Sequence, residues 1–152
     1  LLFDRTLAFG DSFLPRDLLY SPARRQLVDP LGNIFDLGEP NTPPRRLDTS
    51  RGAVGYCGMP LQAQAVDASS GRIFFAASEG AASHLVDDTR LVITSHDPAT
   101  GKREQVAKVR MLDLGLQPLS YPSRLVRTGP DRLVLLTDSG QLVALQGPML
   151  SP

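Results

Sequence analysis

The chain consists of short apolar runs separated by turn-forming residues. The clearest example is Arg124–Leu145, which reads as strand, turn, strand, turn, strand, with breaks at 129–131 and 138–140. Short apolar runs bounded by Gly, Pro, Asp and Ser are typical of β-strands joined by tight turns. Since 152 residues contain 13 Pro and 13 Gly, such breaks recur along the whole chain. The pattern predicts an all-β fold of antiparallel meanders.

Three segments of the sequence resemble one another. In each, an aliphatic residue precedes a turn, an arginine follows a few residues later, and a strand follows the arginine; the pairs are Leu19 and Arg25, Val66 and Arg72, and Val126 and Arg132. Gly32–Leu37 is also similar to Gly140–Leu145. Internal similarity at such spacing indicates repeated β units. We expect a single domain over 1–152 with three blade-like units, at 1–38, 61–111 and 122–147, and a Pro/Gly-rich excursion at 39–60.

The alternation of apolar runs and turns also places individual strands. Outside the last unit, strands are predicted at Leu1–Phe9, Leu18–Tyr20, Gln26–Val28, Asn33–Leu37, Gln62–Asp67, Arg72–Ala77, Arg90–Ser95 and Glu104–Met111. The connector Asp97–Lys102 contains a Pro and a Gly suited to a hairpin turn. A short helical turn is expected at Gly80–Leu85, and Leu112–Tyr121 is expected to be a connector.

Composition excludes several classes of function. Hydrophobic residues make up 41% of the chain, which is enough for a packed core and argues against disorder. Acidic and basic residues balance at 16 each, so no global charge favours nucleic acid or anionic lipid. No apolar stretch approaches the roughly 18 residues of a membrane helix, and no membrane span is expected. Cys57 is the single cysteine, which rules out an internal disulfide, and without a nearby His it is expected to be a buried or inert thiol.

The last unit resembles a known family of repeats. Leu133–Leu145 is similar to a quinoprotein-like (PQQ-like) β-propeller repeat, in which a strand, a short glycine turn and an aliphatic-x-Ala-Leu strand recur in each blade. Asp67–Phe75 and His96–Lys102 are similar to blades of the broader bacterial propeller group. The resemblance implies a propeller-like fold or part of a larger propeller. Because the chain has no Trp, it lacks the tryptophan docking motif of quinone-dependent propellers, and no cofactor is carried over.

Three blades do not close a ring, since propellers contain about four to eight. Either further blades come from other sequence or a partner, or the strands form a small β-sandwich or barrel instead. An open propeller segment would expose unpaired edge strands, which favour pairing with another chain. We therefore expect an oligomer or a larger complex.

A second motif points to different chemistry. Ala8–Ser12 resembles the first block of the GDSL (SGNH) hydrolases, which would make Ser12 a nucleophile. That reaction also needs a histidine base, an orienting acid and oxyanion donors. The family's Gly-x-Asn-Asp and Asp-x-x-His blocks are absent, and His84 and His96 are the only histidines. A serine hydrolase using Ser12 with His96 is therefore kept as the alternative function.

Two further groups of residues are candidates for binding sites. His84, Asp87, Asp88 and His96 are suitable zinc ligands in type, but their spacing matches no compact site, so no metal is predicted. Arg45, Arg46 and Arg51 lie in the Pro-rich excursion and are the predicted binding residues. Tyr20, Phe35, Phe74 and Phe75 are expected in the core or between sheets.

The sequence therefore predicts a non-catalytic scaffold or recognition domain that binds a protein or carbohydrate through its loops or sheet edges. The alternatives are the Ser12 hydrolase and a subunit of an extracellular appendage or surface assembly. No cofactor and no nucleic-acid partner are expected, and the propeller resemblance favours a periplasmic or extracellular location.

Overall fold

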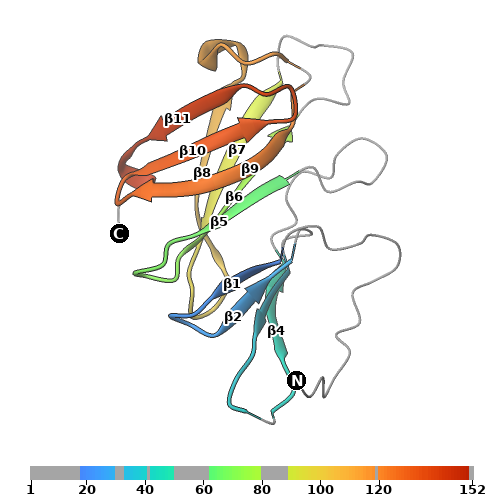
Figure 1. Cartoon of the computed structure of the whole chain (residues 1–152), viewed down its shortest axis with the longest axis vertical. Coiled ribbons are helices and arrows are strands. Elements are labelled where there is room, and N and C mark those ends of the chain that lie inside the picture. Colours follow the sequence, from blue (N-terminus) through green and yellow to red (C-terminus); the bar gives the residue numbers. More distant parts are fainter. Residues whose placement is uncertain are drawn as a thin grey trace, which may run out of the picture.

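The computed structural model describes residues 18–29, 33–40, 42–49, 62–79, 89–118 and 120–150. These residues form three antiparallel meander sheets, which confirms the all-β prediction (Figure 1). The first sheet contains β1 (Leu19–Ser21), β2 (Gln26–Val28), β3 (Asn33–Asp36) and β4 (Arg45–Thr49). The middle sheet contains β5 (Gln62–Val66), β6 (Ile73–Glu79), β7 (Arg90–His96) and β8 (Arg103–Arg110). The third sheet contains β9 (Pro122–Gly129), β10 (Arg132–Thr137) and β11 (Leu142–Gln146).

The strand β4 lies inside the segment 39–60, which the sequence predicted as a loop. It pairs with β3 and forms the outer edge of the first sheet. Its Leu47 packs against the core, whereas Arg45 and Arg46 are exposed. An edge strand needs little apolar surface, so the run from Arg45 to Thr49 lacks the alternation that identifies a half-buried strand.

The middle sheet is covered on both faces. In β6 every residue from Ile73 to Ser78 is buried. Successive side chains of a strand point to opposite faces of the sheet, so continuous burial means that both faces are packed. Phe74 belongs to a core cluster shared with the third sheet, and Phe75 belongs to a cluster shared with the first sheet.

The order of the sheets follows the order of the chain. The first strand of each sheet lies beside the first strand of the next, since β1 neighbours β5 and β5 neighbours β9 (Figure 1). The three similar segments of the sequence fall on the first hairpins of the three sheets, β1–β2, β5–β6 and β9–β10.

Two short 3₁₀ helices accompany the strands. The predicted connector 112–121 contains η3 (Leu112–Leu114), and η4 (Pro148–Leu150) places Leu150 in the core.

Two hairpin turns of the middle sheet have the same construction. In the β5–β6 turn, Asp67 Oδ1 accepts hydrogen bonds from the amides of Ser69 and Ser70, at 2.9 and 3.1 Å. In the β7–β8 turn, Asp97 Oδ1 accepts the corresponding bonds at 2.8 and 2.7 Å. Such a side-chain bond holds the backbone in a turn before the next strand begins. The turn predicted over 97–102 is therefore present.

The four aromatic residues predicted to lie in the core or between sheets differ in their burial. Phe74 and Phe75 are buried between sheets, as predicted. Tyr20 is 53% exposed on the outer face of the first sheet, so its assignment to the core is wrong. Phe35 is half-buried.

The strand predicted at 1–9 and the helical turn predicted at 80–85 lie outside the described residues.

Candidate interaction surface

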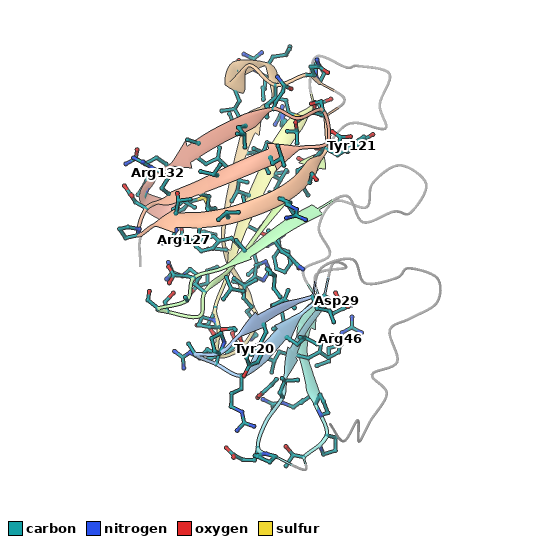
Figure 2. The ribbon with its side chains drawn as sticks, viewed as in Figure 1. Tyr20, Asp29, Arg46, Tyr121, Arg127 and Arg132 are labelled. Carbon is teal, nitrogen blue, oxygen red and sulfur yellow. The ribbon has the colours of Figure 1, made fainter. Side chains whose placement is uncertain are left out.

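The predicted binding arginines Arg45 and Arg46 lie on β4, and Figure 2 labels Arg46 on this strand. The Nη2 atom of Arg45 is 3.7 Å from the Asp36 carboxylate, and the Arg45 side chain is 75% exposed. Arg46 pairs with Phe35 across the sheet. The exposed ion pair between Arg45 and Asp36 contributes little to stability. Arg45 and Arg46 are both exposed, so both guanidinium groups are available to solvent. Arg51 lies outside the described residues.

His96 is buried at the end of β7, where both ring nitrogens have partners. The Nδ1 atom is 2.9 Å from the Gly101 carbonyl oxygen, and the Nε2 atom is 3.2 Å from Thr94 Oγ1. The ring also meets Phe75 edge-on, with centroids 5.1 Å apart. These contacts place His96 as a support for the β7–β8 turn.

The other residues of the hydrolase and metal hypotheses lie outside the described residues. They are Ser12, His84, Asp87 and Asp88, and Cys57 lies there as well. The Ser12 hydrolase therefore stays a prediction. Within the described ranges, no group of three or more His, Cys, Asp or Glu side chains is arranged to hold a metal ion.

A buried ion pair joins the middle and third sheets. The Nε atom of Arg127 in β9 donates to Asp67 Oδ2 at 3.0 Å, and the two side chains are only 10% and 8% exposed. The guanidinium lies over the Phe74 ring, 4.9 Å from its centroid, and its Nη2 atom donates to the carbonyl oxygens of Pro130 and Leu150. Sequence reasoning missed this pair because 60 residues separate the partners and no local pattern indicates that their two hairpins are neighbours.

The pKa of Asp67 reflects this environment. Burial alone would raise the pKa, but hydrogen bonds from the Ser69 hydroxyl and from the amides of Ser70 and Ser69 outweigh burial. The Arg127 charge acts in the same direction as these bonds, and together they lower the pKa from 3.8 to about 2. The carboxylate is therefore ionised at neutral pH, the state in which it pairs with the Arg127 guanidinium.

The first and middle sheets meet through their turns. Gln26 in β2 donates from its side-chain amide to the Pro98 carbonyl oxygen in the β7–β8 turn. The Arg24 side chain lies against Gly71 in the β5–β6 turn. The first and middle sheets are thus held together by polar contacts at their turns as well as by apolar packing between the sheets.

The third sheet has one packed and one open face. Leu125, Leu133 and Leu135 point toward the middle sheet and are at most 5% exposed. Val126, Val134 and Ala144 lie side by side on the opposite face, as do Leu136 and Leu142. On that face Val126 is 53% exposed and Leu142 is 71% exposed. We call these five residues the open face of the third sheet.

An apolar face of this kind marks a surface for contact with another molecule more often than a site of chemistry. Arg124 and Arg132 stand exposed beside it, so its rim is basic. Figure 2 shows Arg132 at one end of β10. Sequence reasoning missed the open face because the continuous apolar run of β10 is the same as in a strand that is buried on both faces.

Searches of family models, curated proteins and solved structures give no match to the chain. Over the described residues, no helix has the length and apolar character needed to span a membrane.

Proposed function

We propose that the chain is a non-catalytic scaffold or recognition domain that binds a protein partner through the third sheet. In this proposal the three sheets are blade-like units of a propeller-like stack. Two arrangements support it: each sheet is a meander, and the first strands of successive sheets are neighbours. The observation that carries the binding function is the open face, where aliphatic side chains are exposed beside β11, an edge strand of the third sheet as far as the structure describes the chain.

The stack explains why this face suits a protein partner. The first sheet covers one face of the middle sheet, and the third sheet covers the other. A further β-sheet packed on the open face would repeat the same arrangement. Covering an exposed side chain such as Leu142 removes apolar surface from water and stabilises a complex by about 1.5 to 3 kcal/mol for a complete burial.

A retention experiment tests the proposal. The immobilised chain is incubated with an extract of the cells that produce it, in parallel with the double variant Val126→Lys/Leu142→Lys. Val106→Lys is the matched control, because Val106 is 45% exposed on β8 in the middle sheet and so lies outside the open face. We expect a bound protein that the wild type and the control retain and the double variant loses. Equal retention by all three proteins would contradict the proposal.

A further inference from the structure

The edge strands of the three sheets differ in charge. In the described part of the chain, β4, β8 and β11 are the outermost strands on the side away from the first strands. β4 contains Arg45, Arg46 and Asp48, and β8 contains Arg103, Glu104, Lys108 and Arg110. β11 has the sequence Leu-Val-Ala-Leu-Gln and carries no charge. Charged side chains protect exposed strand edges against pairing with other chains, and β11 lacks this protection.

In the described part of the chain, β11 differs from the third strands of the first and middle sheets in its pairing. In each, the third strand of the meander pairs on its far side with a fourth, β3 with β4 and β7 with β8. β11 is the third strand of its own sheet, and its far side is open in the described part of the chain. Among the described strands, the third sheet therefore has a position for one more antiparallel strand beside β11.

The backbone of β11 presents hydrogen-bonding groups to this position. The Thr137 amide donates to the Gln141 carbonyl oxygen, so this pair is hydrogen-bonded. Hydrogen-bonded and non-hydrogen-bonded pairs alternate along an antiparallel ladder. Leu142, Ala144 and Gln146 consequently direct their N–H and C=O groups away from β10, toward the open edge.

The sequence of β11 is complementary to itself. If two copies pair antiparallel about Ala144, Ala144 stands opposite Ala144 and Leu142 stands opposite Gln146. The side-chain period of two then keeps residues of the open face on one side and Val143 and Leu145 on the other. No like charges face each other, and a small side chain lies at the centre of the pair.

We propose that β11 pairs with β11 of a second copy across a two-fold axis, which joins the two third sheets into one continuous sheet. This inference rests on the proposed function, in which the third sheet binds a protein partner, and it names a second copy as the partner at the β11 edge of that sheet. Most soluble homo-oligomers are closed dimers with such a two-fold interface. The joined sheet extends the open faces of both copies and places Leu142 within the interface.

Charge substitution at Ala144 tests the inference directly. Light scattering coupled to size exclusion measures the mass of the wild type, Ala144→Lys and Ala144→Glu over a range of concentrations. We expect a wild-type dimer and, because like charges meet at the axis, self-association weakened roughly tenfold or more in each variant. An equimolar mixture of the two variants should recover the dimer, since opposite charges then face each other. This recovery requires Ala144 to oppose Ala144 and would not follow from a defect in folding.

Val106→Lys and Val106→Glu are the matched controls. Val106 is 45% exposed on the edge strand β8, and neither control should change the mass. A wild-type monomer at every concentration would overturn the inference, as would a dimer that neither Ala144 substitution weakens. If such a monomer still retains another protein in a manner that depends on Val126 and Leu142, the proposed function stands and the second copy is the wrong partner.

Discussion

Arg127 illustrates how one side chain connects several parts of this chain. From β9 it donates to Asp67 in the middle sheet, lies over Phe74 and reaches the backbone of η4 at Leu150. Its Nη1 atom is buried without a hydrogen-bond partner among the described residues. A buried pair of this kind adds little net stability over an apolar pair, but the loss of one partner leaves an uncompensated charge. We therefore interpret the pair as a contact that fixes the third sheet on the middle one.

The lowered pKa of Asp67 makes stability depend on pH. A carboxyl whose pKa is 3.8 when unfolded and about 2 when folded stabilises the fold above pH 3.8, and this contribution is lost as the pH falls through 2. The shift corresponds to about 2 kcal/mol. We expect the difference in free energy of unfolding between pH 5 and pH 2 to be smaller by about this amount in Asp67→Asn. Urea denaturation at both pH values measures the difference. An unchanged pH dependence in the variant would contradict the role assigned to Asp67.

At the scale of elements, the turns decide how the sheets meet. The β5–β6 turn closes at Gly71, whose φ of +77° is unfavourable for other residues. A Cβ atom at this position would lie 2.6 Å from Arg24 Cγ, in the first hairpin of the first sheet. The turn is therefore shaped both by its own backbone and by the neighbouring sheet.

Two glycine substitutions separate these effects. Gly140→Ala, at φ +81° with no atom near its Cβ position, should lose about 1 to 2 kcal/mol from the backbone alone. Gly71→Ala should lose more, because it also displaces Arg24. The excess should disappear when Arg24→Ala is added. Thermal or urea unfolding of the variants measures each difference. Equal losses of unfolding free energy at the two glycines would show that contact between the β5–β6 turn and the β1–β2 turn does not restrict position 71.

Several elements were predictable because their signals are local. The hairpin β7–β8 was predicted from Pro98 and Gly101 in its turn, and β6 was predicted from its apolar run. By contrast, β4 was missed because its edge position requires few apolar residues. The Asp67–Arg127 pair and the open face were missed because each depends on which sheets are neighbours. That arrangement is a property of the fold and leaves no mark in a local pattern.

At the scale of the whole molecule, two core clusters join three sheets through the middle one. Phe74 and Phe75 are adjacent in sequence, are at most 2% exposed, and belong to different clusters. If the two interfaces differ in stability, the outer sheets can separate from the middle sheet independently.

Phe74→Ala and Phe75→Ala test this independence. Each should reduce the free energy of unfolding by about 3 to 5 kcal/mol. Amide hydrogen exchange should rise in β9–β11 for Phe74→Ala, and in β1–β3 for Phe75→Ala. Faster exchange throughout the chain in both variants would indicate instead that the three sheets unfold as one cooperative unit.

The continuous burial of β6 also has a consequence during synthesis. The run Ile73–Ser78 has no charge and no proline, and it combines aromatic with small residues, a composition prone to cross-β aggregation when exposed. One of its two covers, the third sheet, comes from sequence that leaves the ribosome later. A nascent chain that ends before β9 therefore displays the Phe74 face to the surrounding cytosol or translocation machinery. Prompt synthesis of β9–β11, or shielding by a chaperone, protects the chain from self-association at that stage.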